Sequence, residues 1–214
     1  MSKPKSRRSY DASRRQERAL ASQERVLAVA RQRFAERGYA ETTIEEIAGA
    51  AGVAVPTVYA AFGSKRGVLA RLLDRLVSGD ASAPPILQTA GAREVLAEPD
   101  RRRALALFAA HMTEIQDRLG PIFEVMKSAA RTEPEVAELY ARAQHNRYAN
   151  LEALARSLAE RGPLRPGVTV EDAARTIWVL ASPETRHMLR AHAGWPAERY
   201  RTWLGDTLAA ALLP

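Results

Sequence analysis

The sequence predicts an all-α protein, and three observations lead to that prediction. Alanine, leucine, arginine and glutamate dominate its 214 residues, whereas aromatic residues make up 6% and β-branched runs are scarce, which favours helices over strands. Apolar residues recur at helical spacing, and no segment alternates as a strand does. Glycine and proline divide this pattern into segments of helical length. With 46% hydrophobic residues, the chain can bury a sizeable core, in one domain or in a small domain followed by a larger one.

The positive charge is concentrated near the start of the chain. Residues 1–75 hold 15 Lys and Arg against 8 Asp and Glu, which accounts for the whole net charge of +7, because the remainder is balanced. This asymmetry indicates a polyanionic partner (a nucleic acid or an acidic membrane surface) or simply a solubilising tail. Residues 1–18 contain seven Lys and Arg and little apolar content, so we expect a flexible, poorly ordered basic arm there.

The first element after this arm is a helix that begins near residue 19. Apolar residues recur at helical spacing from Leu20 to Phe34, and Gly38 is a suitable residue to end the helix. A second start signal follows at once, because Thr43 and Glu46 have the spacing of a capping box.

Two short helices and a longer one are expected next. Gly52 interrupts the first, and the second runs from about Pro56 to Phe62, since proline is tolerated in a first helical turn. The third is capped by Ser64 and continues to Leu76.

Beyond this point a connector and a helical remainder are expected. Residues 78–92 are rich in Ser, Ala, Pro and Gly, which is typical of a connector. Helical segments are then expected over about 100–119, 121–131, 135–161, 170–191 and 196–212. We expect Pro183 to kink or divide the fourth of them.

The stretch from Thr43 to Lys65 fits a helix-turn-helix. Val58 and Phe62 supply the inner face of its second helix, and Gly52 occupies the turn, where a left-handed backbone is unstrained only for glycine. An ordinary helical hairpin would show the same small residues. Both helices are too short to be stable alone, however, and the outer face presents a threonine and a tyrosine. Basic residues follow at the next helix start, where backbone N–H groups favour a phosphate.

In this stretch the sequence resembles the TetR family of bacterial regulators. The matching segments are Thr42–Ala48, Ala51–Val53, Thr57–Tyr59 and Phe62–Lys65. The specific similarity covers about residues 20–75, and the chain length and the helical remainder also fit. The resemblance implies a ligand-responsive DNA-binding transcriptional regulator, usually a repressor. It also implies a homodimer on a palindromic double-stranded DNA operator in the bacterial cytoplasm, released by a small-molecule effector.

The same resemblance divides the chain and assigns contacts. It implies a basic arm over 1–18, a helix-turn-helix DNA-binding domain over 19–66 and a helical ligand-binding and dimerisation domain over 67–214. Phosphate contacts are implied for Thr43, Thr57, Tyr59 and Lys65, and positions near base edges for Ala54, Val55 and Pro56. Many relatives carry a polar side chain on this helix face, whereas here it is mostly apolar. We therefore expect thymine-methyl contacts, Tyr59 and DNA shape to read the operator.

In the C-terminal part, large or polar residues on otherwise apolar faces are candidates for lining an effector cavity. They are Phe108, His111, Met112, Ile115, Phe123, Met126, Tyr140, Tyr148 and Trp178. Each could equally belong to an ordinary core. Leu204, Leu208 and Leu212 of the last helix suit burial against another helix, either within the chain or in the dimer interface that the resemblance implies.

Other classes of function have little support in the sequence. The chain has no cysteine, so disulfides, thiolate metal sites and cysteine nucleophiles are excluded. It has no recognisable catalytic motif, signal peptide or membrane-spanning stretch, and the arm lacks the large apolar residues of a membrane-surface helix. We expect no enzymatic activity, metal or cofactor, and no membrane partner. The alternative is an all-α small-molecule-binding protein or enzyme without a role on DNA.

Overall fold

The computed structural model of this protein describes residues 6–79 and 84–214, with side chains at residue 14 and from residue 16 onward. The regular structure in these ranges is helical, which confirms the all-α prediction. The elements are α1 (Ser6–Glu41), α2 (Ile44–Ala51), α3 (Val55–Phe62), α4 (Lys65–Ser78), η1 (Ile86–Gln88), α5 (Ala90–Ala97), α6 (Arg101–Ala129), α7 (Pro134–Glu160), α8 (Val170–Leu180), α9 (Pro183–His187), η2 (Met188–His192) and α10 (Ala197–Leu212).

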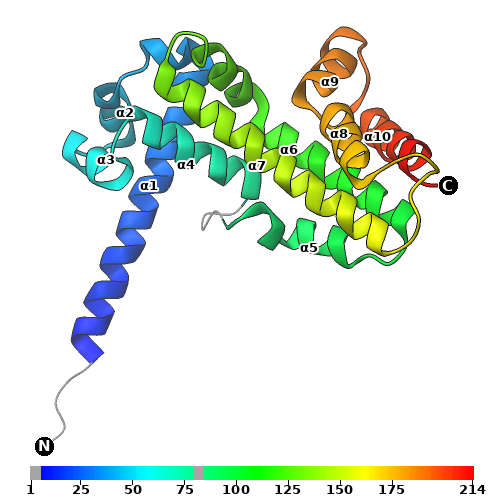
Figure 1. Cartoon of the computed structure of the whole chain (residues 1–214). Helices are drawn as coiled ribbons and strands as arrows, with labels where there is room; N and C mark the ends of the chain where they lie inside the picture. Colours follow the sequence, from blue (N-terminus) through cyan, green and yellow to red (C-terminus); the bar gives the residue numbers. More distant parts are fainter. Residues whose placement is uncertain (1–5, 80–83) are drawn as a thin grey trace, which may run out of the picture.

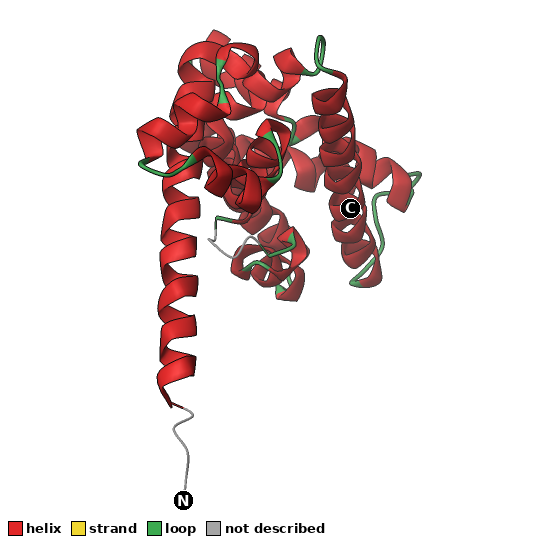
Figure 2. Cartoon of the chain, turned by 90° about the vertical axis from the view of Figure 1, so that its left-hand side faces the viewer, coloured by secondary structure: helices red, strands yellow, loops and turns green. Residues whose placement is uncertain are grey.

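The helices form a small N-terminal cluster and a larger body. Helices α2 and α3 lie at one end of the molecule, and the first turns of α1 project away from it (Figure 1). A view turned by 90° shows the same projecting helix beside the packed remainder (Figure 2). Helices α6 and α7 run through the body, with α5 on one side and α8 and α10 toward the far end (Figure 1).

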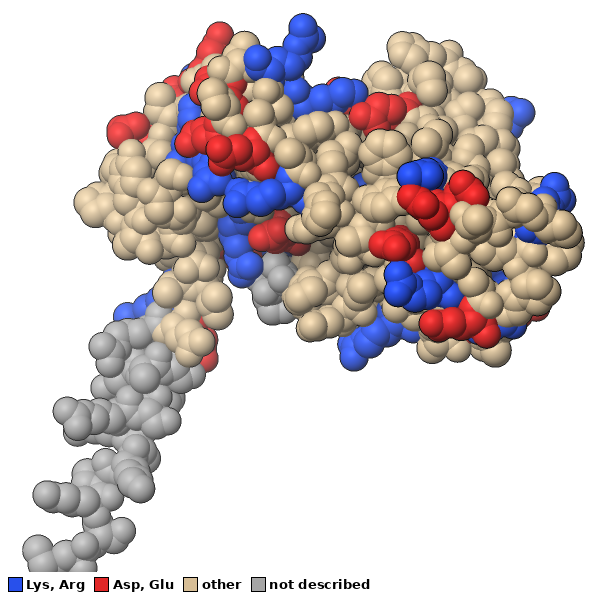
Figure 3. All heavy atoms as spheres, in the orientation of Figure 1, with Lys and Arg blue, Asp and Glu red and all other residues tan. Residues whose placement is uncertain are grey.

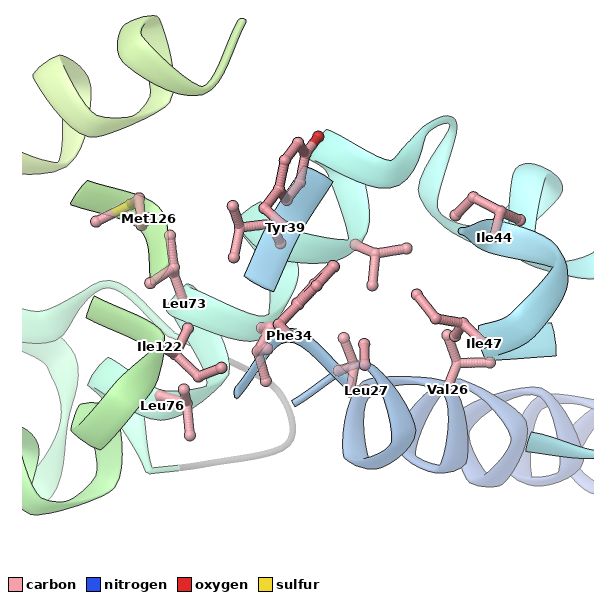
Figure 4. Packing of buried hydrophobic residues seen from close by; sticks show 14 of the residues in the cluster. Val26, Leu27, Phe34, Tyr39, Ile44, Ile47, Leu73, Leu76, Ile122 and Met126 are labelled. Carbon is pink, nitrogen blue, oxygen red and sulfur yellow. The ribbon is translucent and has the colours of Figure 1, made fainter. Parts of the chain in front are cut away.

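The first core joins the N-terminal cluster to the body. It contains buried residues of α1, α2, α3 and α4, and also Ile122, Phe123 and Met126 from the second half of α6. Figure 4 shows Phe34 and Tyr39 of α1 pointing into this cluster, with Ile122 and Met126 nearby. The packing of the N-terminal helices therefore extends into α6 and is not confined to residues 19–66.

The second core lies in the body. Residues from α5, the first half of α6, the second half of α7, α8 and α10 pack together around the fully buried Tyr200 and Leu204. Helix α6 contributes to both cores because it bends at Gly120, whose φ is +42° and which precedes Pro121. The two segments expected over 100–119 and 121–131 are thus two halves of one bent helix.

The structure corrects one expectation about the elements, refines a second and confirms a third. The prediction of a poorly ordered arm is wrong for residues 6–18, which are helical, whereas residues 1–5 lie outside the described residues. The arm contains five arginines, which are good helix formers, and extending an existing helix costs less than starting a new one. Gly38 does interrupt α1 with a φ of +81°, although a further helical turn follows it. The segment 170–191 is divided at Pro183, as predicted.

Helix α5 was not predicted, and its first three residues fall in the presumed connector. Thr89 caps it by accepting a hydrogen bond from the amide of Ala92 at 3.3 Å. Gly91 lies against the ring of His111, and a Cβ added at Gly91 would be 2.4 Å from His111 Nδ1. The glycine that suggested a loop is therefore a site of close packing between α5 and α6.

Candidate nucleic-acid interface and internal cavity

The turn between α2 and α3 has the geometry that the sequence predicts. Thr43 caps α2, with its side chain accepting from the amide of Glu46 at 3.1 Å and its own amide donating to the Glu46 carboxylate at 3.1 Å. Gly52 adopts the left-handed conformation with φ +65° and ψ +38°. The amide of Val53 donates to the carbonyl of Ala48 at 3.0 Å, which closes the turn.

Helix α3 is held by one face and exposes the other. Val58 is buried in the first core, whereas the Tyr59 side chain is 47% exposed. Ala54, Pro56 and Thr57 are also exposed, as expected for the outer face. The surface over the α3 end of the molecule shows no charged side chain in this view (Figure 3), in agreement with the uncharged sequence of α3.

Val55 does not lie on the outer face as expected. It is half-buried and packs against the first core together with Phe62. The reason is helical spacing, because residues 55, 58 and 62 fall on one side of a helix. The base-edge position inferred for Val55 therefore belongs to the packed side of α3.

Lys65 makes contacts within the chain. Its Nζ donates to the carbonyl oxygens of Tyr39 and Ala40 at 2.9 and 3.3 Å and lies 4.3 Å from the centre of the Tyr39 ring. These carbonyls belong to the last turn of α1, where a cation is favourable. Lys65 still lies in the first turn of α4, next to Ser64, so its charge remains near the α3 end of the molecule.

Gly67 is a structural residue of this region that the sequence reading overlooked. A Cβ at this position would be 1.8 Å from the carbonyl oxygen of Phe62, so no other residue fits while α3 and α4 keep their spacing. The only available signal was a glycine three residues after a helix cap, which is not unusual enough to single out.

A cavity of about 580 Å³ lies between α4, α5, α6 and α7. Six of the nine candidates line it: Phe108, His111, Met112, Ile115, Phe123 and Met126. All six belong to α6, where they project toward α5 and α7 on both sides of the bend. This volume is within the range of small-molecule sites.

The other three candidates do not line this cavity. Tyr140 packs against Phe123 with ring centres 6.1 Å apart and accepts a hydrogen bond from Gln144, while Tyr148 packs against the second core. Trp178 also packs against the second core and is covered by the guanidinium of Arg147, 5.6 Å from its ring. Large size on an apolar face marked these residues, but that property does not distinguish a cavity wall from a core.

Sequence reasoning missed much of the cavity wall. Leu73 and Val77 of α4 line it, as do residues 84–87 before α5. So do the polar side chains of Gln116 in α6 and Arg147 in α7. Nothing in the sequence distinguishes Leu73 from an ordinary core leucine.

His111 is the titratable group on the α5 side of the cavity. Burial lowers its pKa below the ordinary histidine value, and the nearby Arg118 lowers it further, against the opposing effect of Glu114 and Glu94. The imidazole is therefore neutral at pH 7. Its Nε2 is buried and has no hydrogen-bond partner among the described residues.

The leucines of the last helix are buried within the chain. Leu204, Leu208 and Leu212 all lie in the second core, where α10 packs on α6. Gly205 permits this approach, since a Cβ there would be 3.3 Å from the Cα of Ala106. The exposed apolar side chains at this end of the body are instead Val179 of α8 and Met188 of η2, which are 54% and 57% exposed.

Among the described residues, no three His, Asp or Glu side chains gather as a metal site would require. None of the helices in 6–79 and 84–214 combines the length and apolarity needed to cross a bilayer.

The family comparison finds a match in the helix-turn-helix region. Residues 26–72 match the model of the N-terminal domain of bacterial regulatory proteins of the tetR family. No curated protein matches the sequence.

Solved structures share the fold over nearly the whole chain. NalD, the secondary repressor of the MexAB-OprM multidrug efflux pump in Pseudomonas aeruginosa, has a TM-score of 0.70 at 22% identity, covering 90% of this chain and 96% of that one. SmeT in complex with triclosan has a TM-score of 0.66 at 22% identity, covering 91% and 92%. FadR from Bacillus subtilis in complex with stearoyl-CoA has a TM-score of 0.67 at 16% identity, covering 88% and 98%.

These similarities agree with the geometry of α2, α3 and the cavity. Residues 26–72 thus match the N-terminal domain of the tetR family of bacterial regulatory proteins, and the chain shares the fold of these solved structures over nearly its whole length.

Proposed function

We propose that this protein is a ligand-responsive repressor that binds a palindromic operator as a homodimer in the bacterial cytoplasm and is released by a small molecule. The observation that carries the proposal is the orientation of α3. Val58 anchors this helix in the core, while the exposed Tyr59, Thr57 and Pro56 face outward, as a helix entering a major groove requires.

The exposed face of α3 suits a particular kind of operator reading. Its small apolar groups can contact thymine methyls but cannot make a bidentate hydrogen bond to guanine. Tyr59 and Thr57 add hydroxyl groups that can donate to phosphate oxygens. Thr43 supports a further phosphate contact from the exposed cap of α2.

Dimerisation is proposed through the far end of the body. Val179 and Met188 expose large apolar side chains there, which a partner subunit would cover. A two-fold axis at this end would place two α3 helices in successive major grooves, about 34–36 Å apart.

Release by an effector is proposed through contacts between α4 and the body. Arg118 of α6 donates from Nε to the carbonyl of Leu76 at 2.9 Å and from Nη2 to that of Val77 at 3.3 Å, which caps α4. Val77 also lines the cavity, so a ligand there contacts the helix that joins α3 to the body. A ligand that binds better to one position of α4 would shift the spacing of the two α3 helices.

A second connection joins the N-terminal helices to α7. The hydroxyl of Tyr39 donates to Glu135 at 3.1 Å, and the carbonyl of Tyr39 accepts from Lys65. A movement of α7 against α1 would thereby reach the first turn of α4.

The experiment that tests the proposal is selection of bound duplexes from a random pool, followed by affinity measurements on the recovered sequence. We expect a palindrome, and we expect Tyr59→Ala to weaken binding to it about tenfold or more without changing the dimer fraction in sedimentation. Tyr59→Phe is the matched control, because it keeps the ring and removes only the hydroxyl. If the selection enriches no sequence, or if Tyr59→Ala binds the operator with full affinity, α3 does not read DNA.

A further inference from the structure

One buried positive charge in the cavity wall has no carboxylate bound to it. Arg147 of α7 donates from Nη2 to the carbonyl of Trp178 at 2.6 Å, and its buried Nε has no hydrogen-bond partner among the described residues. Glu184, which acts on Arg147 electrostatically, is itself paired with Lys127 at 3.1 Å. Arg147 lines the cavity, its guanidinium lies 5.6 Å from the centre of the Trp178 ring, and one of its five donors makes a hydrogen bond within the described part of the chain.

The contacts of Arg147 are more than a helix cap needs. The Trp178 carbonyl lies at the end of α8, where a cation is favourable, but a single carbonyl occupies one of five donors. Arg186 also has a buried Nε, yet it forms an ion pair with Asp117. Arg118, which caps α4, uses two nitrogens on two carbonyls. Of these three arginines, Arg147 is the one that lines the cavity, and it has neither a bound carboxylate nor a second carbonyl among its hydrogen-bond partners in the described residues.

Burial makes this charge costly in the ligand-free protein. Desolvation lowers the pKa of Arg147 to about 10, and Glu184 only partly offsets that effect. The side chain stays protonated at pH 7, so its charge persists in a site that favours neutral groups. An anion bound to the guanidinium of Arg147 would offset this cost through charge-assisted, bidentate hydrogen bonds.

The remainder of the wall fits an apolar body attached to such an anion. Phe108, Ile115 and Leu151 are apolar, and His111 is neutral at pH 7. Asp74 is the acidic residue among the lining residues that the structure describes, and it is exposed at the rim, where Arg71 acts on it. A cationic ligand would meet Arg147 inside the cavity, whereas an anionic one would be paired there.

We propose that the effector of this protein is an apolar molecule with a single anionic group, such as a carboxylate or sulfonate, which pairs with the guanidinium of Arg147. This inference rests on the proposed function, because it names the chemistry of the ligand that would release the operator. The anionic group lies at the α8 end of the cavity, beside Gln116, whose Nε2 bonds the carbonyl of Ala181 at 2.9 Å. The apolar body extends toward α5 and His111.

The test uses two fluorescent probes that differ only in charge. The full-length protein is titrated with 1-anilinonaphthalene-8-sulfonate and with N-phenyl-1-naphthylamine, which is the same molecule without the sulfonate. We expect one site per chain and roughly tenfold or greater preference for the sulfonate, as expected for hydrogen bonds to a charged group. Arg147→Met should abolish this preference, and Arg147→Lys should keep part of it, because the charge remains without the planar fork.

Two further variants and measurements keep the outcomes separate. Ala143→Trp fills the cavity from α7 and should block both probes, while thermal unfolding checks that each variant is folded. Equal affinity for both probes, or a preference that survives Arg147→Met, overturns the inference about the anion. If the anion inference fails but Ala143→Trp still blocks the binding of both probes, the cavity and the proposed function stand. Failure of both probes to bind, or binding that Ala143→Trp leaves unchanged, contradicts the effector cavity and the inference with it.

Discussion

The two cores of this protein share α6 and are both closely packed, whereas the junction between them is hollow. The N-terminal core closes around Phe34 and Ile47, and the body core closes around Tyr200 and Leu204, all fully buried. The cavity lies between them, lined by Phe123 from the first core and by residues such as Phe108 from the second. Each filled core anchors one of these helices, α3 through Val58 and α10 through Leu204, whereas the hollow lies at the junction and is lined from both sides of the bend in α6.

The largest expected effect tests the contrast between filled and hollow packing directly. Phe34→Ala should lower the free energy of unfolding by about 3–5 kcal/mol, because it leaves a void in a closed core. Phe108→Ala should cost clearly less, since part of that ring already faces the cavity. Chemical denaturation of both variants measures the difference, and equal losses would mean that the two regions are packed alike.

A second substitution tests how tightly α3 is held against α4. Gly67→Ala should cost about 3 kcal/mol, because its Cβ would meet the backbone oxygen of Phe62 and force the two helices apart. Gly49→Ala is the matched control, since a Cβ there meets nothing within 4 Å and alanine favours the helix by up to about 1 kcal/mol. Thermal unfolding and operator binding are the measurements. A Gly67→Ala protein as stable as the Gly49→Ala protein would contradict the close contact of α3 and α4.

The smallest expected effect on stability concerns the connection between the two regions. Arg118→Gln removes hydrogen bonds to the end of α4 and should cost about 1–2 kcal/mol. Its effect on the response to ligand should be larger, because Arg118 joins α6 to the end of α4. We expect the sulfonate probe still to bind the variant but to change its operator affinity less than it changes that of the unaltered protein. Operator affinity measured with and without the sulfonate probe tests this. The exposed Arg131→Gln, at the end of α6, serves as the control. An unchanged response in Arg118→Gln would show that α4 is not coupled to the cavity through this residue.

The sequence predicted the N-terminal region well because its signals are local. The capping box at Thr43, the left-handed Gly52 and the exposed Tyr59 each follow from residues a few positions apart. Val55 was expected near base edges, but it lies three residues before Val58 and so shares the packed side of α3. Lys65 was assigned to phosphate from its position, and its contacts with the end of α1 depend on a neighbour 26 residues away.

The body was predicted less completely because its signals are not local. Helix α5 begins in a segment whose glycine suggested a loop, and only the ring of His111 on α6 explains why glycine is needed there. The nine cavity candidates were chosen by size and polarity, and six line the cavity because they share the side of α6 that faces α5 and α7. Tyr140, Tyr148 and Trp178 have the same properties on faces that are packed.

The sequence by itself determined the helical class, the positions of most helix ends and the helix-turn-helix, because propensity, capping and spacing act over a single turn or two. Tertiary structure alone decided which half of α6 joins which core, which side chains border the cavity and that Arg147 lies there without a bound carboxylate. The physical reason is that burial and charge pairing depend on residues brought together from distant parts of the chain. Helical periodicity defines a face of each helix, but it does not specify what that face will meet.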